Sequence, residues 1–299
     1  ASGTRRVMRI LFCSDMSVGL LFMDTCYAIL SKALGTNIKM TLDPTLHAAA
    51  LALFSAMLFA LSIQVQNLGL GHAEPRPGVI INIGTTALVF WCFAPFVVET
   101  SYWLTSATAL FALVGLFRPA LSVNLAVAGV KHMGPTLTSG LAATNPLFAA
   151  CFAILILGEE MTWSLGLGTL AVVCGVAVSA FRPGGLTRGW PLWAIGLPLG
   201  AAFFRALGHP ITIIGLREIP SPYFAGLVGY TVSIIVVYGS FRLQGRRMPT
   251  LTRGHLWFVA SGLLNGVSVY SLNTALGLGS LLTVAPIVAC SPVFTILLG

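Results

Sequence analysis

The chain has few charged residues for its length. Of its 299 residues, 8% are Asp, Glu, Lys or Arg and 57% are hydrophobic, and the mean hydropathy is +0.92. A soluble domain carries about 25% charged residues, so this chain could not cover its surface in water. The scarcity excludes a water-soluble enzyme, a disordered tail and a nucleic-acid-binding domain, and it favours a polytopic membrane protein. The net charge of +8 fits this class, because Lys and Arg accumulate in cytoplasmic loops.

Acidic residues and catalytic motifs are scarcer still. None of the eight Asp and Glu residues falls inside an expected span, whereas a proton-coupled exporter of cations needs a buried carboxylate, so proton/cation antiport is disfavoured. The sequence has no phosphate-binding loop, and its five His are spread singly. We therefore expect no enzyme, no ATP-driven pump and no cofactor. The six Cys form no Cys-x-x-Cys pair, and we interpret them as packed small hydrophobes.

Long apolar runs dominate what remains. A helix crosses the hydrocarbon layer with about 20 apolar residues, and runs such as LALFSAMLFAL are too long for the alternating strands of a barrel. The sequence therefore predicts an all-α, polytopic membrane helical bundle. Nine spans are expected, at 46–66, 78–98, 104–130, 135–157, 162–181, 190–213, 222–241, 256–278 and 281–299.

The first 45 residues differ from the rest. Residues 10–31 are weakly apolar and contain Asp15 and Asp24, which oppose insertion into a bilayer. Three interpretations stay open for residues 1–45: a marginal extra helix, an amphipathic surface segment, or a non-native extension.

The chain contains an internal repeat. Residues 145–148 read NPLF and residues 291–294 read SPVF, and the upstream segments that begin at Gly115 and Gly262 lie at nearly the same distance before them. The period of about 146 residues gives two halves of five helices each when complete. An odd number of helices inverts the second half, and inverted repeats place a binding site near the bilayer midplane. We expect the matched Pro146 and Pro292 to kink their helices.

One half carries a family pattern. Pro146-Leu147-Phe148, the turn Gly158-Glu159-Glu160-Met161-Thr162, and the later Gly166 and Gly175 follow one another within 134–182. This stretch resembles the EamA-type repeat of the drug/metabolite transporter superfamily.

The resemblance implies ten helices in two inverted bundles and the transport, often export, of small metabolites or drugs. It divides the chain into a first repeat at 46–182 and a second at 183–299, whose tenth helix and second Gly-Glu turn are missing, as expected of a truncation. The implied location is the plasma or inner membrane. The expected partners are a small-molecule substrate and the lipid bilayer, with no nucleic acid, and a homodimer is allowed.

The orientation in the membrane stays open. Eight cations are expected on one side, and after the N-terminal segment only Arg217 falls on the other. The positive-inside rule places the eight in the cytoplasm, whereas the family resemblance favours the opposite arrangement. The eight are Arg76, Lys131, Arg182, Arg188, Arg242, Arg246, Arg247 and Arg253.

Polar side chains inside spans are expensive, which makes each a candidate for substrate binding. Arg118 either pairs a substrate carboxylate or phosphate, or bonds carbonyls that Pro119 leaves free, or lies where the helix ends. Arg205 and His209 share a helix face one turn apart, unless Arg205 snorkels to the interface. The remaining candidates either line a cavity or join helices by hydrogen bonds. The full candidate set is Gln64, Arg118, Asn124, Asn145, Arg205, His209, Asn265, Tyr270 and Asn273.

Glu159 stands apart from these candidates. We expect it to lie near the start of the helix that follows it, where the helix dipole favours an acid; holding a loop is the alternative. Taken together, the sequence favours a secondary transporter of small organic metabolites that works by alternating access. The alternative is a membrane-embedded scaffold or a non-ATP-driven enzyme subunit.

Overall fold

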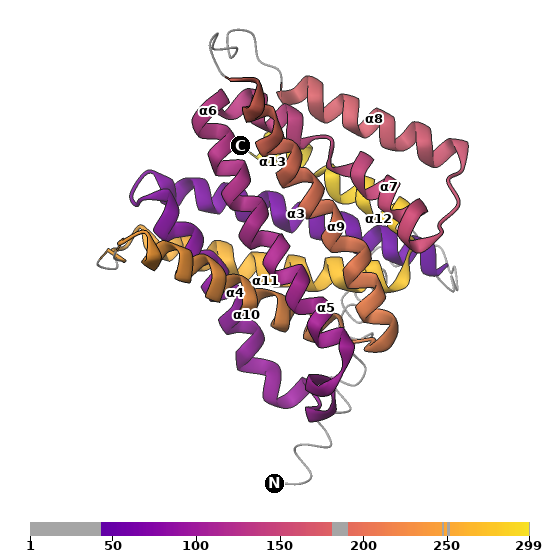
Figure 1. Cartoon of the computed structure of the whole chain (residues 1–299), viewed down its shortest axis with the longest axis horizontal. Coiled ribbons are helices and arrows are strands. Elements are labelled where there is room, and N and C mark those ends of the chain that lie inside the picture. Colours follow the sequence, from indigo (N-terminus) through magenta and orange to yellow (C-terminus); the bar gives the residue numbers. More distant parts are fainter. Residues whose placement is uncertain (1–42, 181–190, 247, 250–251, 299) are drawn as a thin grey trace, which may run out of the picture.

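The computed structural model describes residues 43–180, 191–246, 248–249 and 252–298. Within these ranges every regular element is a helix, which confirms the predicted all-α class (Figure 1). The interpretations of residues 1–42, and three of the eight cations (Arg182, Arg188 and Arg247), fall outside the described residues.

The helices follow the predicted spans closely. The first half contains α3 (Pro44–Leu70), α4 (Pro75–Val97), a 3₁₀ turn η1 (Thr100–Leu104), α5 (Ser106–Gly115), a π-turn η2 (Leu116–Leu121), α6 (Ser122–Ala142), α7 (Asn145–Leu157) and α8 (Trp163–Ala180). The second half contains a 3₁₀ turn η3 (Leu192–Ile195), α9 (Gly196–Glu218), α10 (Pro222–Leu243), α11 (His255–Leu278), α12 (Leu281–Ala289) and α13 (Ser291–Leu298).

Breaks divide two of the predicted spans. α7 begins at Asn145 with Pro146 in its first turn, and α13 begins at Ser291 with Pro292. Proline lacks an N–H and is tolerated in a first helical turn. The expected kinks are therefore present as helix breaks. A further break lies inside α6 at Gly134, whose φ of 80° interrupts the helix.

Six of the described helical segments are long and apolar enough to cross a membrane by length and composition: Pro44–Leu70, Pro75–Val97, Ser106–Gly134, Leu137–Leu157, Leu192–Glu218 and Pro222–Leu243. α8 and the α12–α13 segment are shorter apolar helices. α11 has 24 residues but buries three serines and two asparagines, which lower its hydropathy.

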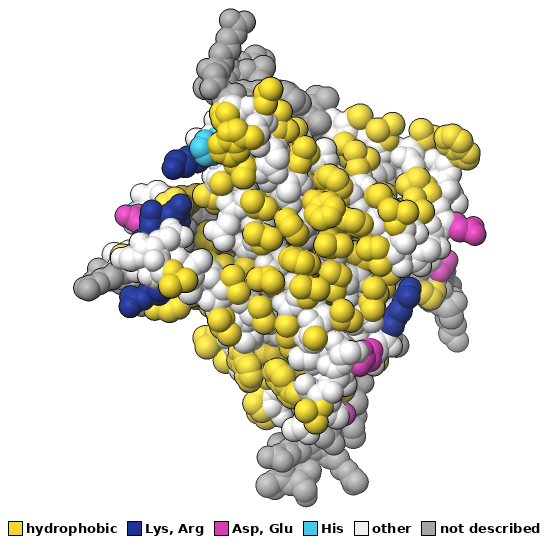
Figure 2. Space-filling model, in the orientation of Figure 1, with side chains coloured by type: hydrophobic (Ala, Val, Ile, Leu, Met, Phe, Trp, Pro, Cys, Tyr) yellow, Lys and Arg dark blue, Asp and Glu magenta, His cyan; other side chains and the backbone are white. Residues whose placement is uncertain are grey.

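Charge separates along the molecule. A broad apolar face covers its middle, most visible Lys and Arg side chains lie at one end, and most visible acidic side chains lie at the other (Figure 2). We name these the basic end, with the turn at 71–74 and residues 244–246, 248–249 and 252–254, and the acidic end, with the turns at 98–105, 158–162, 219–221 and 279–280. Apolar flanks between two charged ends are the arrangement that a bilayer requires.

The cysteines differ from the prediction. Cys92, Cys151 and Cys174 are free and exposed, and Cys290 is free and partly buried. Exposed thiols on apolar helices lie on the outer surface of the bundle instead of packing inside it. A small, weakly polar thiol is tolerated in such apolar surroundings.

The longest helix contact joins α3 and α11. Ser55 and Ser268 each donate a hydrogen bond to the other's backbone carbonyl, at 2.9 and 2.8 Å. Ser62 and Ser261 repeat the exchange at 3.0 and 2.9 Å. Seven residues separate the two pairs on each helix, so the helices run antiparallel in a fixed register. Small hydroxyl residues permit this close approach.

A second extensive helix contact is made by α9, which packs against α5, α6 and α7. A Cβ on Gly215 would lie 2.4 Å from the Phe111 ring, and one on Gly208 would lie 3.7 Å from the Arg118 Cβ. α9 therefore also runs antiparallel to its partner, which is the α5–η2–α6 segment. α4 packs against α10, and α7 packs against α12, between these two helix pairs.

Candidate functional site

Arg118 lies where the third span is not α-helical. Its φ and ψ are −136° and 118° inside the π-turn η2. Such a turn leaves backbone carbonyls without their helical partners. Ser233 of α10 donates a hydrogen bond to the Gly115 carbonyl at 2.6 Å and lies 3.5 Å from the Arg118 carbonyl. A hydroxyl, and not the Arg118 guanidinium, therefore satisfies this part of the backbone.

The Arg118 side chain points to α9. Its Nη1 lies 3.2 Å from Nδ1 of His209, which is 4% exposed. A guanidinium can only donate, so Nδ1 accepts and His209 is the neutral tautomer with its proton on Nε2. Arg205 precedes His209 by one turn, and its charge acts on both Arg118 and His209. We name Arg118, Arg205 and His209 the cation cluster.

Asn265 joins this region through a tyrosine. Its Nδ2 donates to Tyr230 Oη at 2.9 Å and to Thr86 Oγ1 at 3.2 Å. Tyr230 lies near Arg118 as well. The sequence reasoning missed Tyr230, Thr86 and Ser233, because single hydroxyls barely change hydropathy. A usable signal existed, since Thr86 and Ser233 lie 147 positions apart, close to the repeat period.

Three other candidates are placed away from the cation cluster. Gln64 donates to the Thr295 carbonyl at 2.6 Å and so joins α3 to α13. Asn273, 3% exposed, donates to the Pro222 carbonyl at 3.2 Å at the acidic end. Tyr270 packs against the aromatic core around Phe90. Gln64 and Asn273 thus join helices in the way that polar groups do in membrane bundles.

Two asparagines retain hydrogen-bonding capacity. Asn124 is exposed and donates to the Ala120 carbonyl, one turn earlier in the same span, at 2.9 Å. Oδ1 of Asn145, at the start of α7, is buried and has no hydrogen-bond partner among the described residues. A buried orphan acceptor of this kind costs about 1–3 kcal/mol unless water or a ligand binds it.

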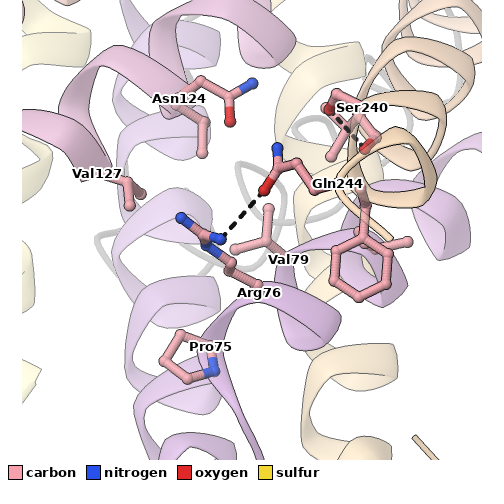
Figure 3. Close-up of a pocket in the computed structure, with 11 residues that line it drawn as sticks. Pro75, Arg76, Val79, Asn124, Val127, Ser240 and Gln244 are labelled. Carbon is pink, nitrogen blue, oxygen red and sulfur yellow. Dashed lines mark hydrogen bonds between the residues drawn. The ribbon is translucent and has the colours of Figure 1, made fainter. Parts of the chain in front are cut away.

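A pocket opens at the basic end between α4, α6 and α10, with a volume of about 110 Å³. Asn124 and Val127 of α6 face Arg76 of α4 and Gln244 of α10 across it (Figure 3). Arg76 Nη1 donates to Gln244 Oε1 at 3.4 Å at the rim. The pocket thus combines an apolar wall with one cation and two amides.

At the acidic end, aromatic side chains of α4, η1, α5 and α10 pack together. Phe224 lies 5.4 Å from Tyr102 and 6.0 Å from Phe111, between ring centroids. Phe90 lies 5.1 Å from Tyr223 and 6.2 Å from Tyr230. Phe90, Phe111 and Phe224 are almost completely buried. Tyr230 packs against this aromatic cluster.

Glu159 binds a different helix from the one expected. Its two carboxylate oxygens accept from the backbone N–H groups of Leu281 and Leu282 at 2.7 and 2.9 Å. These are the first residues of α12, so the acid caps α12 and not α8, the helix that follows it. Gly158 makes this possible, because its φ of 69° ends α7 and redirects the chain. Unpaired N–H groups and the dipole favour an anion there.

Metal chemistry finds no support in the described part of the chain. No group of three or more His, Cys, Asp or Glu side chains there could hold a metal ion. The described acids lie at helix ends, and Glu218 accepts from the Ser106 N–H at the start of α5 in the same manner as Glu159.

Comparisons with known proteins agree with this architecture. Residues 46–181 match the sequence model of the EamA-like transporter family. Among solved structures 14 chains match, one of them titled only "Crystal structure of protein". That chain aligns with a TM-score of 0.71 at 15% identity, over 84% of this chain and 86% of its own length, which shows a shared fold. A search of curated proteins finds no match. The apolar helices and this match indicate a multi-pass membrane protein whose residues 46–181 are similar to the EamA-like transporter family.

Proposed function

We propose that the protein is a secondary transporter of small organic metabolites in the plasma or inner membrane. In this proposal two inverted repeats, residues 46–182 and 183–299, alternately expose a site between them. The family match supports a transporter as the general class. The repeats and the mechanism are supported by the contacts between the two halves.

The observation that carries the proposal is a matched pair of hydrogen bonds. Thr86 donates to the Gly262 carbonyl at 2.8 Å, and Ser233 donates to the Gly115 carbonyl at 2.6 Å. Both donors and both acceptors are 147 positions apart. Each bond joins one half to the other, as expected for repeats related by a pseudo-twofold axis in the membrane plane.

Close backbone crossings follow the same relation. A Cβ on Gly115 would lie 2.2 Å from the Gly229 carbonyl oxygen, and one on Gly262 would lie 2.6 Å from the Asn82 carbonyl oxygen. The same 147 positions separate Asn82 from Gly229. In addition, α3 packs on α11, α12 and α13, while α9 packs on α5, α6 and α7. Each half therefore packs mainly through the other, which suits rocking of one repeat against the other.

Access from one side fits one state of such a cycle. The pocket opens at the basic end between α4, α6 and α10, while the aromatic cluster fills the space between α4, α5 and α10 at the acidic end. The described conformation would then be open toward the basic end. The reverse state requires α4, α6 and α10 to close around the pocket.

Reversible cross-linking tests this cycle. Val127→Cys with Gln244→Cys, in a chain whose native cysteines are replaced, places one thiol on α6 and one on α10 across the pocket. A bifunctional methanethiosulfonate should abolish flux of a carried solute in proteoliposomes, and reduction should restore it. Each single-cysteine variant, treated identically, is the control and should keep its flux.

Two results count against the proposal. Undiminished flux in the cross-linked double variant contradicts alternating access through this opening. If the uncross-linked chain carries no member of a panel of amino acids, nucleosides and organic anions, secondary transport itself is contradicted.

A further inference from the structure

We infer that the cation cluster binds the carboxylate or phosphate of a small organic anion. This inference rests on the proposed transport function and names its substrate class. The site consists of Arg118, Arg205 and His209, with Tyr230 beside Arg118.

Charge balance is the first support. The described acids, Asp43, Glu74, Glu99, Glu159, Glu160 and Glu218, all lie at helix ends or in turns. No described carboxylate interacts with either guanidinium of the cluster, whose electrostatic partners are each other, His209 and Tyr230. Two positive charges in a bilayer without a counter-ion are costly. An anion between them removes that cost, whereas a neutral solute does not.

Hydrogen-bonding capacity is the second support. The Gly115 carbonyl, just before the π-turn, is bound by Ser233 at 2.6 Å, so it does not occupy the guanidinium of Arg118. One described hydrogen bond of that guanidinium goes to His209. Guanidinium has five N–H donors in a planar fork that matches carboxylate and phosphate. His209, neutral in this contact, adds an Nε2–H donor and no further charge.

Local packing directs these groups to one place. The non-helical backbone of Arg118 interrupts the third span, and the Cβ position of Gly208 on α9 lies 3.7 Å from the Arg118 Cβ. Arg205 and His209 lie on either side of Gly208 within one turn of α9. The helix break and the packing of α9 against η2 therefore bring cations from the two halves of the chain together.

The pocket at the basic end is lined by residues close in sequence to Arg118 and Ser233. The pocket is lined by Val123 and Asn124, less than two turns from Arg118 along the same span. On α10 it is lined by Val237, one turn beyond Ser233. Arg76 lies at the pocket rim (Figure 3). A rim cation and deeper cations of the same sign draw anions inward and repel cations.

The test measures binding on the full chain in nanodiscs of neutral lipid. Thermal unfolding is followed with inorganic phosphate, citrate, glucose or choline as the probe. Phosphate or citrate should raise Tm with a saturable dependence, because both bind the folded state only. Glucose and choline should not. Arg118→Gln and Arg205→Gln should weaken the apparent affinity for the anion about tenfold or more, because each removes a charge-assisted contact.

Two further variants keep the result interpretable. Arg217→Gln removes the same charge from the acidic end of α9 and should leave the anion shift unchanged. Arg205→Gln should also raise the anion-free Tm, because it removes repulsion from Arg118, whereas loss of a purely structural contact would lower it. If Arg118→Gln fails to fold, Arg118→Lys should bind the anion more weakly than wild type.

The outcomes separate the two proposals. An anion shift that survives in both Gln variants, or an equal shift with glucose, overturns the inference. Stabilisation by phosphatidylglycerol alone, with none by phosphate or citrate, assigns the cluster to a lipid headgroup and also overturns it. If Arg205→Gln leaves the flux of neutral solutes into proteoliposomes undiminished, the anion site is rejected and the transporter proposal stands. Anion binding without flux of any solute keeps the site and rejects transport.

Discussion

Two long helix interfaces of this bundle share a geometry and differ in content. α3 and α11 run antiparallel, and two serine pairs satisfy each other across them. α9 runs antiparallel to the α5–η2–α6 segment, but there the partner is interrupted at Arg118 and the interface holds two cations and His209. The first interface satisfies its own polar groups. The second leaves charge unsatisfied, which is why we place the binding site there.

The largest effect is expected where backbones touch at the interrupted interface. Gly115→Leu would force a Cβ to within 2.2 Å of the Gly229 carbonyl oxygen, and no side-chain rotation relieves a backbone clash. We expect a loss of about 3 kcal/mol or more of unfolding free energy, and loss of the monodisperse peak in size-exclusion chromatography. Gly239→Leu, on α10 with nothing within 4 Å of its Cβ position, is the control. Equal behaviour of the two variants would show that α5 and α10 do not cross there.

The next effect concerns flux and not stability. Arg118→Ala should abolish proteoliposome flux of an anionic substrate, while the helical circular dichroism spectrum stays that of wild type. The reason is that the guanidinium bonds only the side chain of His209 and carries no part of the backbone hydrogen bonding described for η2. Ser271→Ala, which removes a bond within α11, is the control and should transport normally. Normal flux in Arg118→Ala would remove this residue from the site.

The serine pairs provide a test of the α3–α11 interface, whose polar groups bond each other. Ser55→Ala with Ser268→Ala should lower the unfolding free energy by about 1 kcal/mol, the size measured for hydrogen bonds between membrane helices. Denaturant titration of both single variants and the double variant gives the coupling between the two sites. Because the exchange is reciprocal, the two effects should not add. Strict additivity would contradict a cooperative pair, and flux should be little changed in all three variants.

The smallest effect belongs to the acidic end. Glu159→Gln should destabilise the protein by about 0.5–1 kcal/mol, because it removes the negative charge from the α12 N-terminus while an amide oxygen can still accept one bond. Glu160→Gln changes the same charge on the exposed neighbour and should be silent in a thermal melt. If both variants lose the same stability, local charge and not the α12 cap explains the effect.

Sequence reasoning found the helices because their signal is one-dimensional. Length and apolarity decide whether a segment can satisfy its backbone inside a bilayer, and the observed helices follow the nine expected spans. The length and apolarity of a segment do not tell which helix a polar side chain will bond. Gln64 and Asn273 were as polar as Arg205 in the sequence, yet they bond carbonyls of neighbouring helices. The acid Glu159 was expected near the start of α8, and it caps α12 from 122 residues away.

The sequence alone determined that this chain is a helical membrane protein with a repeated pattern, because scarcity of charge and the length of apolar runs act locally along the chain. Only the tertiary structure decided which polar groups meet. Arg118 and His209, 91 residues apart, come together because a π-turn interrupts the third span and α9 packs against it. Such meetings depend on packing between distant segments, and packing leaves almost no trace in composition or hydropathy.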